Sequence, residues 1–362
     1  MNMFHSFLMM ILVVFSGFWA MYTVFLPILK KYMQKFEIKF YMLPFLYILL
    51  LYSLAVSVIF FWIDRTDFIV SLSLWRAFLP LLLCALIYAV SLLWGGIALK
   101  ITVVAAISTM VLSYPVDAGF AYLPMNPMVT KVLLIAFFSV FCLGYPLMNS
   151  TVHTFTVPSV VTLFGVCLLN LFGGAPMYSA LCAAFLAGLL LAYMAPNFYN
   201  EKLVFEDGAC VGTAFLICSI LLLQLGEFSF PSCVIFTSVF AAELLVALWN
   251  KFSVNHGGTL LENTFYYKAA QIRTAYVLSL DILKISAISL FFGCFQMSAV
   301  NTYSVFIISV LITMWLNSSI AKNRGKQSIR EINRDFVDEV KQNISETKEA
   351  LKKIQERHDN ED

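Results

Sequence analysis

Long apolar runs follow one another at short intervals along this chain, and most are about as long as a helix must be to cross a lipid bilayer. Hydrophobic residues make up 61% of the 362 positions and charged residues 12%, against roughly 45–50% and 25% in soluble domains. A soluble fold cannot keep that much apolar surface from water. We therefore predict an all-α, polytopic membrane protein with about ten or eleven transmembrane helices.

The predicted spans cover nearly all of the chain up to residue 320. They are 5–29, 41–63, 74–96, 101–116, 129–148, 157–172, 178–195, 209–224, 231–250, 275–294 and 301–319. The run at 101–116 is short and begins with β-branched residues, so a re-entrant or extracytoplasmic segment is the alternative there. The first run is too long for a signal-peptide core and no basic residues precede it, which predicts a helix that stays.

Lysine and arginine predict the orientation, because cytoplasmic loops of membrane proteins are enriched in both. Three basic groups, Lys30–Lys39, Lys251–Arg273 and Lys322–Lys326, fall on one side if there are eleven spans. This places the N-terminus outside and the C-terminus in the cytoplasm. Arg65 and Lys131 are exceptions on the other side.

The C-terminal segment, 321–362, differs from the rest because it carries 10 Lys/Arg and 10 Asp/Glu of the chain's 23 and 21. Its apolar residues recur at alternating spacings of three and four, which predicts an amphipathic helix or a short coiled coil. A solvated helix without a partner is the alternative. We predict a transmembrane domain, 1–320, and a cytoplasmic helical tail, 321–362, that could bind a second copy or a cytoplasmic partner through 326–358.

Three ionisable residues lie inside predicted spans, where a charge is costly and therefore needs a reason. Glu243 lies in the ninth span, and Asp281 and Lys284 lie in the tenth. One interpretation is structural: an ion pair between Asp281 and Lys284 at i, i+3, with Glu243 protonated. The other is a polar site that is open to the cytoplasm.

The predicted cytoplasmic loops supply further polar candidates. Glu206 and Asp207 come just where the eighth span begins, and a carboxylate there could hold Mg²⁺ beside a phosphate or simply occupy a helix N-terminus. His153 and His256 lie in polar loops, where single histidines are often only solvated. No basic stripe indicates nucleic acid binding, and the eight cysteines form no CxxC pair that would indicate a zinc site.

Four segments carry a family resemblance. ALCAAFLAGLLLAYMAPNF (180–198) and EKLVFEDGACVGTAFLICSI (201–220), together with FAAELLVALWNKF (240–252) and the basic FLPILKKYMQKFEI (25–38), resemble the polyprenyl-phosphate N-acetylhexosamine-1-phosphate transferases. These multi-span bacterial enzymes start envelope glycan synthesis with cytoplasmic catalytic loops and an external N-terminus.

The resemblance implies roles for particular residues. Asp207 takes the place of the family's invariant Asp and would hold Mg²⁺ or pyrophosphate, while Glu243 and His256 would assist as catalytic residues. Lys202 takes the place of the Lys that precedes the invariant Asp. The residues that we expect to bind substrate are Lys202, Asn149, Asp281 and Lys284.

The chain departs from the family's acidic motifs at two places. WGGIALK (94–100) has no carboxylate where an Asp pair follows the third span, and NSTVHTF (149–155) has Val152 and Phe155 where acidic residues are expected. The similar-looking IDRTDF (63–68) falls on the opposite side of the membrane.

We therefore expect a divergent or degenerate member of the family in a bacterial inner membrane. It would act on or bind a lipid-linked sugar phosphate, with polyprenyl phosphate and a UDP-sugar as ligands and Mg²⁺ only if it is active. The alternatives are a transporter or channel that uses Glu243, Asp281 and Lys284, and a structural membrane subunit that recruits a partner through its tail.

Overall fold

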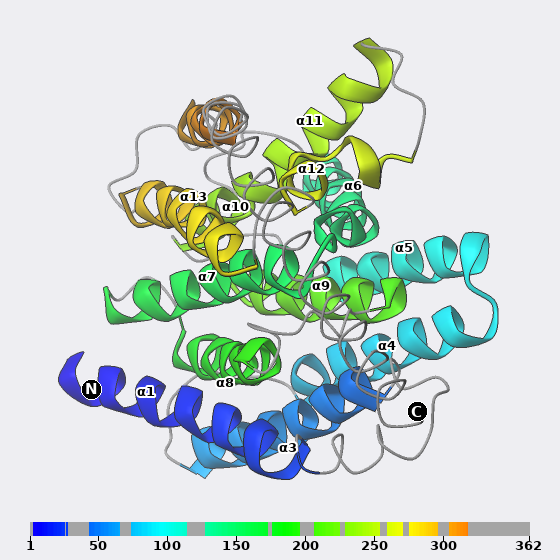
Figure 1. Ribbon diagram of the computed structural model, residues 1–362. Coiled ribbons are helices and arrows are strands. Elements are labelled where there is room, and N and C mark those ends of the chain that lie inside the picture. Colours follow the sequence, from blue (N-terminus) through cyan, green and yellow to red (C-terminus); the bar gives the residue numbers. More distant parts are fainter. Residues whose placement is uncertain are drawn as a thin grey trace, which may run out of the picture. The chain divides into compact units, whose positions relative to one another are not determined.

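The computed structural model describes residues 3–25, 27, 43–65, 74–113, 127–172, 176–195, 206–224, 229–253, 259–270, 275–295 and 304–317. Nearly all of these residues are helical and none of them is in a β-strand, which confirms the predicted all-α class (Figure 1). The chain divides into two compact units, Met1–Trp315 and Leu316–Asp362. The predicted tail, 321–362, lies outside the described residues, and its helix stays a prediction.

Every predicted span contains a helix. In chain order these are α1 (Met3–Ala20, continued by the π-helix η1, Met21–Phe25), α3 (Leu43–Arg65), α4 (Leu74–Leu93), α5 (Gly96–Ser113), α6 (Pro127–Gly144), α7 (Val152–Leu171), α8 (Met177–Met194), α9 (Asp207–Leu222), α10 (Ser229–Phe236) with α11 (Ser238–Ser253), α13 (Ala275–Phe295) and the helix 304–317. Shorter helical turns, η2 (Tyr145–Met148), η4 (Leu261–Asn263) and α12 (Phe265–Ala270), lie between spans.

Within the described part of the chain, seven helices are long and apolar enough to cross a membrane, which confirms a multi-pass membrane protein. One of them is α5, so the segment that starts at residue 101 is part of a regular helix at least as far as Ser113. Three shorter helices, 77–93, 207–222 and 304–317, are also apolar.

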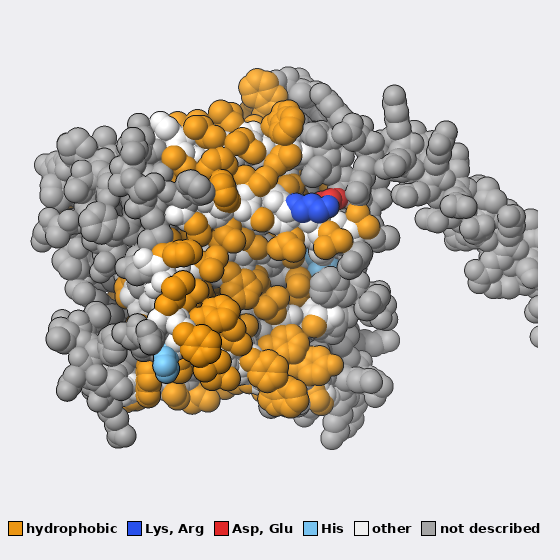
Figure 2. Space-filling model, turned by 90° about the vertical axis from the view of Figure 1, so that its left-hand side faces the viewer, with side chains coloured by type: hydrophobic (Ala, Val, Ile, Leu, Met, Phe, Trp, Pro, Cys, Tyr) orange, Lys and Arg blue, Asp and Glu red, His pale blue; other side chains and the backbone are white. Residues whose placement is uncertain are grey.

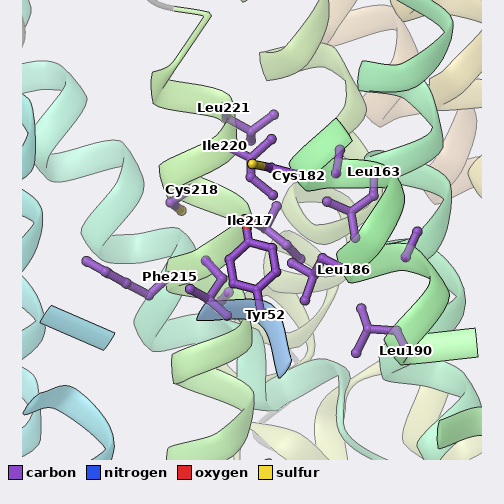
Figure 3. Packing of buried hydrophobic residues seen from close by; sticks show 14 of the residues in the cluster. Tyr52, Leu163, Cys182, Leu186, Leu190, Phe215, Ile217, Cys218, Ile220 and Leu221 are labelled. Atoms are coloured by element: carbon purple, nitrogen blue, oxygen red, sulfur yellow. The ribbon is translucent and has the colours of Figure 1, made fainter. Parts of the chain in front are cut away.

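The core is built around α7, α8 and α9. These helices are apolar on all sides and almost wholly buried, as expected of helices enclosed by others. α8 packs against α1, α3 and α7, and α9 packs against α4 and α6. Figure 3 shows Tyr52 of α3 lying among side chains from neighbouring helices, including Leu186 of α8 and Ile217 of α9.

Glycines allow several of these helices to approach closely. A Cβ at Gly188 of α8 would lie 2.2 Å from the carbonyl oxygen of Val14 in α1, so the two backbones are in contact there. On α9, Gly208 faces Ser91 of α4 and Gly212, one turn later, faces Phe45 of α3. Small residues four apart are the usual means of close helix packing in membranes, where lipid supplies no hydrophobic driving force between helices.

The outer surface is strongly apolar. On α1 alone, Phe4, Leu12, Phe15 and Trp19 are exposed. Figure 2 shows one face of the molecule as largely hydrophobic, with basic and acidic side chains of the described residues gathered in one small patch. Such a surface is stable in hydrocarbon, and in water it would be far larger than the apolar patches of soluble monomers.

Candidate functional site at the η2 turn

Four segments that are far apart in the sequence meet around η2. This 3-10 turn follows α6 directly and packs against α9, α11 and η4. Pro146 stands in its first turn, and a proline at this position cannot continue the hydrogen-bonding pattern of α6. The turn thereby brings together three parts of the chain: α9, which is the eighth predicted span, α11, which ends before residues 254–258, and η4, which follows them.

Tyr145 is the centre of this meeting point. Its ring packs against Phe141, Phe155 and Phe240, with centroid distances of 4.9, 5.2 and 5.8 Å. Its hydroxyl is 2.7 Å from the Ser159 hydroxyl. Phe240 reaches Tyr145 because Gly144 leaves room for it: a Cβ there would lie 2.8 Å from the Phe240 ring.

The start of α7 is fixed by two threonines. Thr151 is the N-cap, and its hydroxyl accepts from the backbone N–H of Thr154, whose hydroxyl accepts in turn from the backbone N–H of Thr151. Thr154 also donates to the carbonyl oxygen of Met148. This reciprocal capping satisfies backbone groups that would otherwise lack partners, and it ties η2 to α7.

Glu243 lies in the first half of α11 and is only 1% exposed. One carboxylate oxygen accepts hydrogen bonds from the backbone N–H groups of Phe265 at 3.0 Å and Tyr266 at 3.3 Å. These are the first residues of α12, where unpaired N–H groups and the positive end of the helix dipole favour a carboxylate. The carboxylate thus joins α11 to α12.

Tyr266 is buried beside Glu243, with 1% of its surface exposed. Its hydroxyl has no hydrogen-bond partner among the described residues. Burial raises the pKa of Tyr266 well above 10, and the nearby Glu243 carboxyl and Tyr145 hydroxyl raise it further. The hydroxyl therefore stays protonated and remains available as a donor.

Asp207 is the first residue of α9 and its side chain is exposed, while Glu206 before it is half-buried. α9 packs against η2. The exposed carboxylate therefore stands at the start of a helix that contacts η2.

A magnesium site can be tested against these side chains. No group of three or more His, Cys, Asp or Glu that could hold a metal occurs in the described parts of the chain. Mg²⁺ is, however, commonly bound through one or two carboxylates together with substrate phosphates. Asp207, with Glu206 beside it, fits only this second arrangement.

No protein-family model matches the chain, and no curated protein matches it either.

The other predicted residues are placed as follows. Asn149 follows η2 and is half-buried, and its backbone N–H donates to Pro146 O at 2.9 Å. Asp281 of α13 is buried and lies 3.8 Å from the ammonium of Lys284, which is 73% exposed. Lys202 and His256 lie outside the described residues. The structure thus brings Asn149 and Glu243 to the η2 turn, whereas Lys284 points outward.

In the segment 94–100, where the family has an Asp pair, residues 94 and 95 form a tight turn after α4 and residues 96–100 begin α5. Gly95 and Gly96 both have positive φ, at 56° and 48°, a conformation that side chains with a Cβ rarely adopt. Trp94 and Ile97 flank the turn with 73% and 76% of their surface exposed. Apolar side chains with a tryptophan at a helix end are typical of the membrane interface.

Tyr145, Tyr266 and Thr154 were not predicted as members of this site. Tyrosine and threonine are common in apolar helices, so the residue types alone gave no signal. The sequence Gly144-Tyr-Pro146 could have indicated the end of α6, because a proline two residues after a glycine is a strong helix-breaking signal.

Proposed function

We propose that this protein binds a sugar phosphate that is linked to a lipid or a nucleotide, as a divergent member of the polyprenyl-phosphate N-acetylhexosamine-1-phosphate transferase family. One observation carries the proposal. The segments that resemble the family at Asp207 and Glu243, and the segment after His256, all pack near the same turn, η2.

The proposal is binding and not transfer, because two acidic motifs of the family are replaced by structural elements. Residues 94–96 form an apolar turn, and residues 149–154 cap α7. Catalysis of phosphoryl transfer depends on positioned groups that stabilise developing charge. At these two positions the chain has a turn and a helix cap in place of acidic side chains. It therefore lacks groups that phosphoryl transfer needs, and binding is the function that we propose.

Each residue would contribute to binding in a different way. Glu243 holds the start of α12 in place, beside the buried Tyr266. Asp207 and Glu206 would hold Mg²⁺, which neutralises phosphate charge when it is bound. The proposed setting is a bacterial inner membrane, with this end of the helices in the cytoplasm.

Binding can be measured with the purified protein in detergent. We expect UDP-N-acetylhexosamine or undecaprenyl phosphate to raise the melting temperature in the presence of Mg²⁺. Asp207→Asn should weaken binding about tenfold, the equivalent of roughly 1.4 kcal/mol, because it removes the exposed carboxylate. Asp281→Asn is the matched control, since Asp281 lies on α13 and forms an ion pair with Lys284 of the same helix. If neither ligand binds, or if both variants lose binding equally, the proposal is wrong.

A transporter is the second candidate, and one observation favours it. The ninth span is interrupted at Thr237, between α10 and α11. Thr162 donates to the carbonyl oxygen of Phe236 at 3.4 Å, and the Ser238 hydroxyl lies 2.7 Å from that of Ser309. Interrupted helices line the substrate sites of many transporters.

Transport would be tested by solute or proton flux in proteoliposomes. A transporter should show flux that falls severalfold in Ser238→Ala, which removes a hydroxyl at the interruption and little else. Flux no greater than that of empty liposomes would exclude this candidate and leave the binding proposal unaffected.

A further inference from the structure

α13 carries a lysine on its outer surface in the middle of a membrane span. Val277–Cys294 of this helix is one of the seven described segments that are long and apolar enough to cross a bilayer. Lys284 lies near the middle of this segment, and its side chain is 73% exposed. Charged side chains inside membrane spans almost always face other protein or a water-filled cavity. An exposed lysine at this depth therefore needs a partner.

The lysine belongs to a single exposed stripe along the helix. The exposed residues between 277 and 294 are Leu280, Leu283, Lys284, Ala287 and Phe291. Four of them, from 280 to 291, follow spacings of four, three and four, and such spacings form the seam along which two helices pack. Ala287 is small, and small residues let helices approach closely in membranes. The stripe thus has the pattern of a helix contact.

Water at the membrane surface is too far away for Lys284 to reach. Val277, at the nearer end of the span, is about 10 Å away along the helix axis, whereas a lysine side chain extends about 6 Å from its Cα. Among the described residues, its ion pair is with Asp281 of the same helix, at 3.8 Å. This distance is too long for a hydrogen bond. The three N–H donors of the ammonium therefore need acceptors from a neighbouring molecule.

The neighbour must present a carboxylate at the depth of Lys284, and this chain has one. The predicted spans contain two carboxylates, Glu243 and Asp281, and Glu243 is buried and bonded to the start of α12. Asp281 lies about 4.5 Å from Lys284 along the axis of α13. All copies of a chain insert in the same direction, so a two-fold axis along the membrane normal brings the Asp281 of a second copy to this depth. The pair has no net charge, so two copies do not repel each other.

We propose that the exposed stripe of α13 is the contact between two copies of this protein in the membrane, with Lys284 of each copy paired to Asp281 of the other. A two-fold contact uses the same residues from both copies, so both ion pairs form together. Each ammonium then has a carboxylate from its own helix and one from the facing helix. This contact lies on α13 and does not depend on the function proposed for the η2 turn.

Charge variants of the full-length protein test the ion pairs. Dimer formation is measured in phosphatidylcholine liposomes by energy transfer between two fluorescently labelled populations, over a range of protein-to-lipid ratios. Lys284→Asp puts only negative charges at the contact and should weaken dimer formation at least tenfold. Lys268→Asp is the matched control, because Lys268 is exposed on α12, outside the spans. Combining Asp281→Lys with Lys284→Asp restores opposite charges and should recover most of the dimer.

Covalent trapping keeps the proposal testable if the charge variants do not fold. Ala287→Cys should form a cross-linked dimer with a copper–phenanthroline oxidant, whereas the eight native cysteines are buried or half-buried. Leu54→Cys, which is exposed on α3, is the matched control and should stay monomeric. A wild type that is monomeric at every protein-to-lipid ratio, a Lys284→Asp variant that dimerises as the wild type does, or equal cross-linking of both cysteine variants would overturn the proposal. A complex with a different membrane protein that is lost in Lys284→Asp would overturn it too, and would assign the stripe to that protein.

Discussion

Valine in place of Gly188 is expected to force α1 away from α8 and to destabilise the protein by about 3 kcal/mol, the upper end of ordinary overpacking costs. A Cβ at this position would lie 2.2 Å from the carbonyl oxygen of Val14 and 3.0 Å from the backbone nitrogen of Phe18. Both atoms belong to the backbone of α1, which cannot rotate aside as a side chain can. The two helices must therefore separate along much of their contact.

The measurement is the melting temperature in detergent, together with protease cleavage of α1. Gly17→Val should behave similarly, because its Cβ would lie 2.7 Å from the carbonyl oxygen of Phe185 on the facing helix. Ser16→Val is the matched control: it adds a β-branched side chain to α1 on an exposed position, where substitutions usually change stability by less than about 0.5 kcal/mol. A Gly188→Val protein that melts together with the wild type would show that the two backbones are not in contact.

The spans were predictable because length and apolar composition are local properties. Each predicted span contains a helix, and the segment from 101, whose β-branched start made it the weakest, is part of α5. The boundary between this span and the one before it was predicted too far along the chain, because α4 already ends at Leu93 and α5 begins at Gly96. We predicted a loop between 96 and 101, but Gly95 and Gly96 adopt positive φ and let α5 begin at once.

The partners of the helices were not predictable, because transmembrane helices have nearly the same composition. Nothing in α1 indicates that it packs against α8, whose glycine lies more than a hundred residues further along the chain. The spacing of Gly208 and Gly212 does indicate a close helix contact, but not that α4 and α3 supply it.

Only part of the candidate site was predictable from the sequence. Glu243 stood out because a carboxylate in an apolar span is costly. Its partners are backbone N–H groups of Phe265 and Tyr266, and every residue except proline has such a group. A sequence pattern cannot choose among them, so the capping of α12 becomes visible only when the fold is known.

Alanine in place of Glu243 is expected to release the start of α12. The change leaves the N–H groups of Phe265 and Tyr266 without their carboxylate acceptor. An unsatisfied buried donor costs about 1–3 kcal/mol, so the two together should weaken this segment by about 2–6 kcal/mol. Hydrogen exchange should report the loss directly, because these two amides should exchange at least tenfold faster than in the wild type.

Glutamine at position 243 distinguishes the hydrogen bonds that the carboxylate accepts from its negative charge. Its side-chain carbonyl oxygen can still accept from these N–H groups, so Glu243→Gln should keep most of the protection at 265 and 266 while removing any negative charge. If glutamine also preserves ligand binding, Glu243 is a positioning residue that sets the place of Tyr266. If alanine leaves both amides as protected as in the wild type, the link between α11 and α12 does not depend on this side chain.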